Sequence, residues 1–322
     1  MHAAVVLGPG RDPVYAEFPD PVANPGEQVV AVTAAALSPL ARARAAGSHY
    51  SANHGFPFVA GVDGVGRLAD GRRVYVGLAR APYGTIAERT VAPDARCLPL
   101  PDDLDDLAAA AIANPGASSW VSLTERARLR PGETVLVNGA TGAAGRLAVQ
   151  IARHLGAGRV VATGRNRAAL AEVAALGADA TIPLVEDDAA MAAAFEPLFA
   201  AGVDVVLDYL WGRSALQLLT AAGRTRGYGA PVRFVQVGSV SGPEIMLPSA
   251  VLRSAPIELL GSGLGTIPLD RHFARTAEML QAAGPAGLRV ATRVVPLASV
   301  AEGWAHPVPD LRTVFTVDRP SA

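Results

Sequence analysis

The chain has 322 residues, half of them hydrophobic, which suffices for two domains with sizeable cores. Its formal net charge of −1 gives no electrostatic reason to expect binding to nucleic acid or to an anionic membrane. The one cysteine, Cys97, excludes an internal disulfide and a metal site built from several cysteines, and every basic residue other than histidine is an arginine.

The first hundred residues are predicted to be rich in β-structure. Short apolar runs alternate there with glycine and proline turns, and the strand candidates are residues 2–7, 28–36, 72–76 and 85–91. Such punctuation favours a compact, barrel-like domain over an α/β layer.

The pattern changes at residue 102. Apolar residues recur at helical spacing over 104–112, and a second helix is predicted over 118–127. Strands and helices then alternate, the strands being 135–137, 159–163, 180–182, 203–207, 232–237 and 257–260, and the helices 146–155, 167–176, 189–200 and 215–221. This alternation predicts a doubly wound parallel sheet with helices on both faces.

The last part of the chain is expected to return to the first domain. It contains a predicted helix (271–282), a strand (290–295), a short helix (300–304) and a final strand (313–317). We therefore predict a β-rich domain of residues 1–113 and 258–322 and a nucleotide-binding domain of residues 114–257.

The most informative stretch is residues 134–145, TVLVNGATGAAG. A buried strand runs into Gly139, Gly142 and Gly145, and an amphipathic helix follows, which is the context that a dinucleotide fingerprint requires. The first glycine allows the turn, the second allows a pyrophosphate to approach the backbone, and the third allows helix and strand to pack closely. The spacing G-x-x-G-x-x-G departs from the usual G-x-G-x-x-G.

The predicted cofactor contacts lie at the carboxyl ends of the strands. For the pyrophosphate they are Gly139, Thr141, Gly142, Ala143, Ala144 and Gly145. For the nicotinamide end they are Asp208, Tyr209, Val237, Gly238, Ser239, Gly261, Ser262 and Gly263.

The end of the second strand predicts the choice of cofactor. NAD-binding sheets carry an acidic residue there to hold the ribose 2′-hydroxyl. This chain has Gly164, Arg165, Asn166 and Arg167 instead. Because an arginine pairs well with a 2′-phosphate, we predict NADPH, with Gly164, Arg165 and Arg167 in the site.

The order of these parts resembles the medium-chain dehydrogenase/reductase superfamily, and within it the zinc-independent quinone oxidoreductases. The stretches that carry the resemblance are residues 36–39, 61–66, 83–88, 130–133, 139–145, 204–209 and 295–301. The resemblance implies a GroES-like barrel domain, a Rossmann domain and reduction of quinones or α,β-unsaturated carbonyl compounds with NADPH.

Departures from the zinc-dependent relatives imply a protein without zinc. Those relatives place a cysteine where Ser38 stands and a His-Glu pair where Val62 and Asp63 stand. Catalytic zinc needs about three protein ligands. A site made of His49, His54 and Asp63 is the alternative, and their spacing does not favour it.

The catalytic candidates are Ser38 and Tyr50. Without a metal, hydride transfer to an electron-poor carbon leaves charge on an oxygen that hydrogen-bond donors can stabilise. Ser38, Tyr50, Tyr209 and water are candidate donors. The resemblance places an active-site tyrosine near position 50, and it leaves open whether Tyr50 or His49 lines the site.

Two other functions remain open. One is a pathway-specific enoyl reductase of secondary metabolism, and the other is a non-catalytic NADPH-binding protein. With no signal peptide or membrane-spanning run in the sequence, we expect a cytoplasmic protein with a small-molecule substrate. The apolar strand 257–260 and the resemblance together predict a homodimer.

Overall fold

The computed structural model describes residues 1–48, 55–225, 227, 229–308 and 310–317. The chain forms two compact units. The first unit comprises Met1–Asn114, Thr276–Pro285 and Arg289–Ala322, and the second comprises Pro115–Arg275 and Ala286–Leu288. The predicted domain limits differ from these units mainly over residues 258–275, which cluster with the second unit.

The first unit is built on a largely antiparallel sheet with the strand order β15-β16-β3-β5-β6-β8, in which β7 also pairs with β3. A smaller sheet has the order β2-β1-β4. The strands are β1 (His2–Val6), β2 (Val14–Glu17), β3 (Glu27–Ala36), β4 (Phe58–Val59), β5 (Asp63–Arg67), β6 (Arg73–Gly77), β7 (Arg89–Pro93), β8 (Cys97–Pro99), β15 (Thr292–Pro296) and β16 (Arg312–Thr316). β16 pairs with β3, so the end of the chain completes this unit as the sequence predicted.

Two short helices cover the core of the first unit, α1 (Pro39–Ala45) and α9 (Val300–Ala305). Trp304 on α9 and Phe315 on β16 are almost wholly buried in a cluster that also contains Ala41 and Ala45 of α1. The early and late parts of the chain thus share one hydrophobic core, which stabilises the unit through buried apolar area.

The second unit contains a six-stranded parallel sheet with the order β11-β10-β9-β12-β13-β14. The strands are β9 (Thr134–Asn138), β10 (Arg159–Gly164), β11 (Ala180–Pro183), β12 (Val205–Asp208), β13 (Val232–Gln236) and β14 (Ile257–Gly261). Numbered from β9, this order is 3-2-1-4-5-6, the order of the Rossmann fold. The predicted fold class, a Rossmann domain with a β-rich domain, is confirmed.

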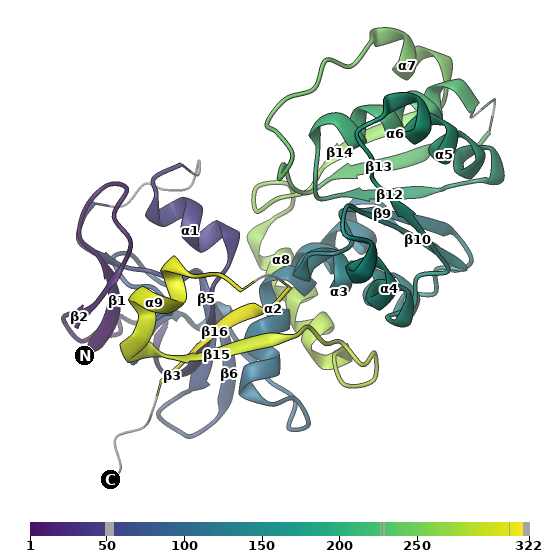
Figure 1. Ribbon diagram of the computed structural model, residues 1–322. Coiled ribbons are helices and arrows are strands. Elements are labelled where there is room, and N and C mark those ends of the chain that lie inside the picture. Colours follow the sequence, from purple (N-terminus) through teal and green to yellow (C-terminus); the bar gives the residue numbers. More distant parts are fainter. Residues whose placement is uncertain (49–54, 226, 228, 309, 318–322) are drawn as a thin grey trace. The chain divides into compact units, whose positions relative to one another are not determined.

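Helices lie on both faces of the parallel sheet, with α3 and α4 on one side and α5 and α6 on the other (Figure 1). The helices of this part of the chain are α3 (Ala143–His154), α4 (Arg167–Ala175), α5 (Asp188–Ala201), α6 (Gly212–Thr225) and α7 (Ser249–Ser254). Phe195 and Phe199 of α5 and Leu218 of α6 are buried against β9 and β12. The central strands are therefore covered on both faces, as their continuous apolar runs require.

Some element boundaries were predicted wrongly. Instead of two helices, a single helix α2 (Asp106–Val121) runs through Pro115, and a π-helical turn, Ser122–Arg126, follows it. The alanine-rich sequence around Pro115 has high helix propensity and is buried, which outweighs the lost N–H donor. The strand expected over 85–91 is displaced to β7, and α1 and α7 were not predicted.

The helix α8 (Leu269–Ala282) begins close to the position predicted for it. Among the residues that the structure describes, no helix is both long and apolar enough to cross a bilayer.

Candidate functional site

The predicted fingerprint lies where the parallel sheet reverses its strand order. β9 pairs with β10 on one side and with β12 on the other, and the chain leaves β9 through Gly139. In open α/β sheets, ligands bind at this switch point, beyond the carboxyl ends of the strands. The fold therefore places residues 139–145 at the position expected for a nucleotide.

The three glycines of this turn serve different purposes. Gly139 has φ = 90°, and a Cβ there would lie 2.8 Å from the side chain of Leu210. A Cβ on Gly145 would overlap the carbonyl oxygen of Gly139. Gly142, by contrast, has an ordinary φ of −78°, is exposed, and would have nothing within 4 Å of a Cβ. The fold needs Gly139 and Gly145 but does not need Gly142.

The helix that follows the turn begins without a cap. Gly142 is the N-cap residue of α3, no side chain accepts a hydrogen bond from the first turn, and that turn contains no acidic residue. The first N–H groups of a helix require partners from outside the helix and carry a positive partial charge. The start of α3 is thus suited to an anion such as a phosphate.

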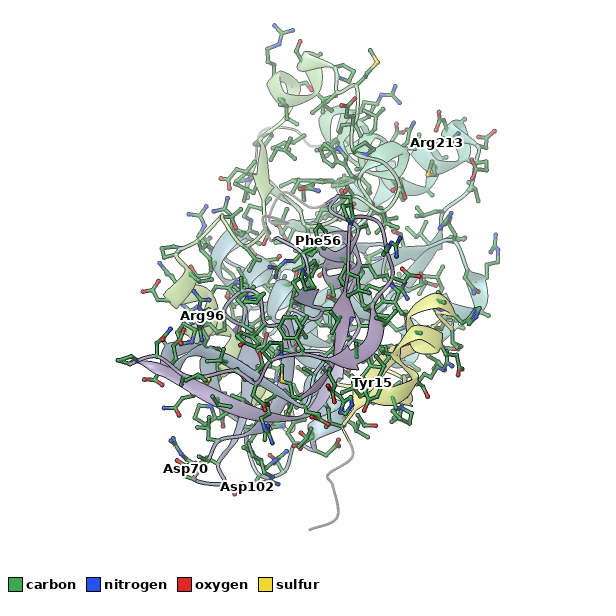
Figure 2. All side chains as sticks on the ribbon, turned by 90° about the vertical axis from the view of Figure 1, so that its left-hand side faces the viewer. Tyr15, Phe56, Asp70, Arg96, Asp102 and Arg213 are labelled. Atoms are coloured by element: carbon green, nitrogen blue, oxygen red, sulfur yellow. The ribbon has the colours of Figure 1, made fainter. Side chains whose placement is uncertain are left out.

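The helix α5, on the other face of the sheet, begins differently. Asp187 accepts a hydrogen bond from Ala190 N at 2.7 Å, and Asp188 lies in the first turn. Arg213, labelled in Figure 2, forms ion pairs with Asp188 at 2.7 Å and with Glu186 at 2.8 Å. This helix start is already satisfied by its own acidic residues and their counterion.

The end of β10 presents the arginines predicted to bind a 2′-phosphate. Gly164 is buried, and a Cβ there would lie 2.5 Å from Thr141 Cγ2, which explains the close approach of the two turns. Asn166 caps α4 by accepting hydrogen bonds from Ala168 N and Ala169 N, and it separates Arg165 from Arg167.

Both arginines at this strand end are available to a ligand. Arg165 and Arg167 are exposed, and within the described residues neither forms an ion pair with a carboxylate. Arg167 also lies at the positive end of α4, where a cation is unfavourable. A bound phosphate would relieve that unfavourable placement.

A buried polar network holds the glycine turn. Asn138 Nδ2 donates to Asp208 Oδ1 at 2.8 Å, and Thr163 Oγ1 donates to Asn138 Oδ1 at 2.7 Å. Thr163 Oγ1 in turn accepts a hydrogen bond from Gly139 N at 3.2 Å. The network thus connects the ends of β12, β9 and β10 to the first N–H group of the turn.

The carboxylate of Asp208 also fixes the turn after β12. It accepts hydrogen bonds from Leu210 N at 3.0 Å and Trp211 N at 3.1 Å. Burial raises the pKa of Asp208, while the hydrogen bonds from Asn138 and from the two backbone N–H groups oppose that rise. Asp208 was predicted from the sequence, but Asn138 and Thr163 were not. Each of these two is a polar residue at the end of an apolar strand, and that pattern could have indicated them.

The residues predicted for the nicotinamide end lie after β12, β13 and β14. Gly238 lies against the backbone of Tyr209, since a Cβ on Gly238 would be 2.6 Å from the Tyr209 carbonyl oxygen. Ser262 Oγ accepts a hydrogen bond from Ser122 Oγ at 3.0 Å. The structure brings seven of the residues predicted for the nicotinamide end to the edge of the sheet where the glycine turn lies. They are Tyr209, Val237, Gly238, Ser239, Gly261, Ser262 and Gly263.

Tyr209 is engaged with the protein itself. Its hydroxyl is 2.8 Å from Ser119 Oγ, which also donates to Pro115 O at 3.0 Å and approaches Ala144 O at 3.2 Å. Burial raises the pKa of Tyr209, so the phenol stays protonated. Through Ser119, this tyrosine is linked to the first turn of α3.

The two predicted catalytic residues belong to the first part of the chain. Ser38 is buried and caps α1, its Oγ accepting a hydrogen bond from Ala41 N at 3.0 Å. That bond uses the oxygen as an acceptor and leaves the hydroxyl proton to be donated. Tyr50, like His49 and His54, lies outside the described residues, so its assignment stays a prediction.

Two buried charged residues, Asp63 and Arg312, occupy the interior of the first unit. The charge of Arg312 and the backbone N–H of Asn114 both act on the Asp63 carboxylate. Burial raises the pKa of Asp63 to about 7, against the opposing charge of Arg312. No group of three or more potential metal-ligating residues occurs in the part of the chain that the structure describes.

Arg146 is a further basic residue near the turn, and it was not predicted from the sequence. Arg146 Nε donates to the Thr141 carbonyl oxygen at 2.9 Å, and its Nη2 lies 2.8 Å from Glu172 Oε2 on α4. It therefore supports the residues between Gly139 and Gly142 from the first turn of α3. The sequence feature that could have indicated this role is the position of Arg146 directly after the third glycine.

Comparison with known proteins agrees with this geometry. The family model described as "Zinc-binding dehydrogenase" matches residues 143–282. That match begins after Ser38 and Val62, so it does not include the positions at which zinc-dependent relatives carry ligands. A curated relative, "Probable NADPH-dependent quinone reductase tdiC" of Emericella nidulans, is 30% identical over 307 residues, covering 83% of this chain and 85% of the relative.

Solved structures show a similar fold over nearly the whole chain. The quinone oxidoreductase of Thermus thermophilus, determined also in complex with NADPH, is 30% identical with a TM-score of 0.80, covering 98% of this chain and 100% of the other. A structure described as an NAD-dependent alcohol dehydrogenase is 26% identical with a TM-score of 0.83, covering 99% and 100%.

Proposed function

Because the chain belongs to the medium-chain dehydrogenase/reductase superfamily of oxidoreductases, in its quinone oxidoreductase-like part, we propose that it is an NADPH-dependent reductase of quinones or of α,β-unsaturated carbonyl compounds. The observation that carries this proposal is the start of α3. There the helix has no side-chain cap, and nothing lies within 4 Å of where a Cβ on Gly142 would be, so a phosphate could approach the backbone.

The residues around the turn fit a dinucleotide phosphate. Thr141, Gly142, Ala143 and Ala144 would offer backbone N–H groups to the pyrophosphate. Arg165 and Arg167 would pair with the 2′-phosphate through charge-assisted hydrogen bonds, which favours NADPH over NADH. Residues 164–167, at the end of β10, include no acidic residue of the kind that would favour NADH.

When bound, the cofactor would supply a hydride. The chain would orient the cofactor and would provide the proton that the reduced substrate takes up. The network of Asn138, Thr163 and Asp208 fixes the turn that would hold the cofactor. Ser38 Oγ retains a proton to donate to an oxygen that gains charge. Tyr50 or water would complete protonation of the reduced substrate, and Tyr209, bonded to Ser119, would position rather than protonate.

We also propose that the reaction needs no zinc. Ser38 and Val62 stand at two positions where zinc-dependent relatives have ligands, and neither is a zinc ligand of the usual kinds. Elemental analysis of the purified protein should therefore show far less than one zinc per chain. Stoichiometric zinc that is lost together with activity on chelation would contradict the proposal.

An isotope label tests the reaction itself. With NADPH deuterated at the transferred position of C4 and an enone, we expect deuterium on the β-carbon of the product. Gly142→Val is the matched control, which should keep its fold and transfer no label. A label on the carbonyl carbon of a saturated ketone would instead make the protein an alcohol dehydrogenase.

A homodimer remains part of the proposal. β14 is the last strand of the parallel sheet in the described chain, and Leu259 on it is 40% exposed. An apolar edge strand tends to be covered by another chain or by charged residues. Light scattering at micromolar concentration should give twice the monomer mass of 33.0 kDa, and a monomer mass would contradict it.

A further inference from the structure

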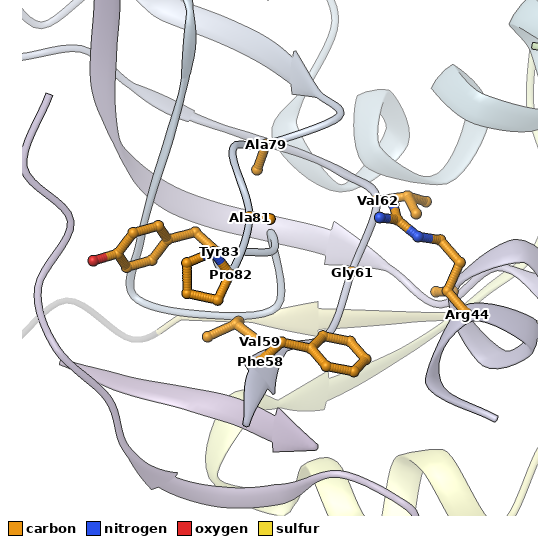
Figure 3. Close-up of a pocket in the computed structure, with 10 residues that line it drawn as sticks. Arg44, Phe58, Val59, Gly61, Val62, Ala79, Ala81, Pro82 and Tyr83 are labelled. Carbon is orange, nitrogen blue, oxygen red and sulfur yellow. The ribbon is translucent and has the colours of Figure 1, made fainter. Parts of the chain in front are cut away.

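The pocket between α1 and the residues around β4 is too small for an organic ligand (Figure 3). Its lining includes Arg44, Phe58 and Pro82, and its cavity volume is about 20 Å³. That volume suits a single water molecule. The contacts that bear on the proposed reaction lie instead in the second unit, at the end of β14.

The π-helical turn Ser122–Arg126, which follows α2, lies in the second unit. Ala127 N donates to Ser122 O at 2.8 Å, a bond that spans five residues instead of the four of an α-helix. The wider turn changes the direction of the side chains that it carries. Turns of this kind occur often at functional sites.

Side chains of this turn hold the segment at the end of β14, residues 261–266, which we call the β14 loop. Arg126 Nε donates to Gly261 O at 2.8 Å, and its Nη1 approaches Thr266 O at 3.5 Å. Ser122 Oγ lies 3.0 Å from Ser262 Oγ. Arg126 thus connects the two ends of the β14 loop.

Glu125 anchors the helix that follows the β14 loop. Its side chain is only 8% exposed and pairs with Arg271 at 2.9 Å and with Arg275 at 2.6 Å. These two arginines are four residues apart on α8, so they lie on one face of that helix. A carboxylate with two charged partners and little exposure to solvent holds them more firmly than an exposed pair does.

The β14 loop is itself compact and yet open to approach. Thr266 N donates to Gly263 O at 3.0 Å, and Gly263 N donates to Thr266 Oγ1 at 3.1 Å. Gly261 and Gly265 are exposed, neither has a positive φ, and a Cβ on either would have nothing within 4 Å. The fold thus fixes the place of the loop and leaves its backbone accessible.

We propose that Arg126 is a positioning residue of the reductase, which acts through the β14 loop to place the nicotinamide end of the cofactor, with Ser122 as its helper. The inference rests on the proposed function, in which residues 261–263 line that end of the site. Hydride transfer depends steeply on placement, and a shift of about 1 Å can lower the rate about a hundredfold. The phosphate end depends on residues 139–145 and on Arg165, so a loosened loop should change turnover far more than affinity.

Amide hydrogen exchange tests the hold on the loop without any turnover. Arg126→Met should speed exchange in residues 262–266 at least about tenfold and leave exchange in β9 to β13 unchanged. Arg128→Met is the matched control, because Arg128 pairs with Glu258, further back on β14, at 3.5 Å. It should leave exchange in the loop unchanged. NADPH should slow exchange in the loop of the unmutated protein.

Kinetics tests the consequence for hydride transfer. With NADPH and a quinone, Arg126→Met should lower kcat at least about tenfold and raise the deuterium isotope effect on kcat, because the hydride step becomes slower relative to the others. The Kd for adenosine 2′,5′-bisphosphate, a probe without nicotinamide, should stay unchanged. Arg126→Lys keeps a charged donor for Gly261 O and should restore most of kcat, and Arg128→Met should match the unmutated protein.

A second variant keeps the test decisive if Arg126→Met folds poorly. Ser122→Ala removes the hydroxyl that faces Ser262 and should change loop exchange and kcat in the same directions, by about threefold. Thr124→Val is its control, because Thr124 Oγ1 donates to Trp120 O at 2.7 Å in the same stretch of helix, and it should change neither quantity.

Three outcomes would overturn the proposal: unchanged loop exchange in a folded Arg126→Met, a loosened loop with an unchanged kcat, or NADPH binding that leaves the loop unprotected. If the unmutated protein binds NADPH but reduces no quinone or enone, the reductase itself fails. The exchange measurements still decide in that case whether Arg126 holds the loop and whether NADPH reaches it.

Discussion

The helices α3 and α5 both follow strands of the same parallel sheet, and yet they begin in opposite ways. Asp187 caps α5, Asp188 adds a negative charge to its first turn, and Arg213 balances the acids. α3 begins at Gly142 with neither a capping side chain nor an acid. The start of α5 is satisfied by the chain's own side chains, whereas the start of α3 has no side-chain cap.

The glycines around α3 support the same distinction. Gly139 is fixed by its positive φ and Gly145 by its contact with the Gly139 backbone, so both are explained by folding alone. Gly142 has no such structural requirement, and a ligand that approaches the backbone would account for it. We therefore propose Gly142 as the binding position, because it is the glycine of the turn that the folded chain does not need.

The largest effect is expected from giving α3 the cap that α5 has. Gly142→Asp places an acceptor and a negative charge at the helix start, which should leave the free energy of unfolding unchanged or slightly raised. The same carboxylate would repel the pyrophosphate and occupy its place, so the Kd for NADPH should rise by about a hundredfold or more. Fluorescence titration and chemical denaturation measure the two quantities.

Gly145→Val is the contrasting variant in the same turn. Its side chain would overlap the Gly139 backbone, so it should lower the free energy of unfolding by about 1–3 kcal/mol. A Gly142→Asp protein that binds NADPH normally, or that loses as much stability as Gly145→Val, would remove the distinction between the two glycines.

The next largest effect is expected at Arg165, beside the capped start of α4. Arg165→Ala removes a charged donor to the 2′-phosphate, so KM for NADPH should rise by about 10-fold to 100-fold, with little change for NADH. Arg224→Ala, an exposed arginine at the end of α6 that pairs with Glu196, is the control and should change neither KM. Equal KM values for the two cofactors in the unmutated protein would contradict the assignment.

The sequence predicted the parallel sheet well because its signals are local. The apolar run before Gly139 and the glycines that follow predict β9, the turn and α3. These signals all lie within about 20 consecutive residues. The bounds of β10, β13 and β14 were accordingly close to those observed. Pro115 misled the prediction of α2, because burial of an alanine-rich segment is a tertiary effect that no local signal reports.

The site was predictable only in part, for the same reason. The fingerprint named Gly142, but only the structure shows that a Cβ there meets nothing and that α3 lacks a cap. Thr163 lies 24 residues from Gly139 along the chain, and their hydrogen bond depends on the pairing of β10 with β9. The role of Tyr50 stays a prediction.

A smaller effect is expected from the network that holds the turn before α3. Thr163→Val keeps the shape of the side chain but leaves Gly139 N and Asn138 Oδ1 without this partner, which should cost about 1–3 kcal/mol in the free energy of unfolding. The loosened turn should also raise the Kd for NADPH by about tenfold, and Thr163→Ser should restore it.

Thr85→Val is the matched control for that change. Thr85 is equally buried and donates to Asp63 O at 2.7 Å in the first unit. Thr85→Val should lower the free energy of unfolding about as much as Thr163→Val does, without changing the Kd for NADPH. If both variants weaken cofactor binding alike, the network has no specific positioning role.

The smallest effect is expected from removing the cap that α5 already has. Asp187→Ala takes away the acceptor of Ala190 N, a loss of about 1 kcal/mol in the free energy of unfolding. Because the chain itself satisfies this helix start, no ligand depends on it, and the Kd for NADPH should stay unchanged. Asp187→Asn should restore most of the stability, since an asparagine caps equally well. Denaturation curves and NADPH titrations on the same three proteins decide the point, and a loss of NADPH affinity in Asp187→Ala would show that the two helix starts are not distinct in function.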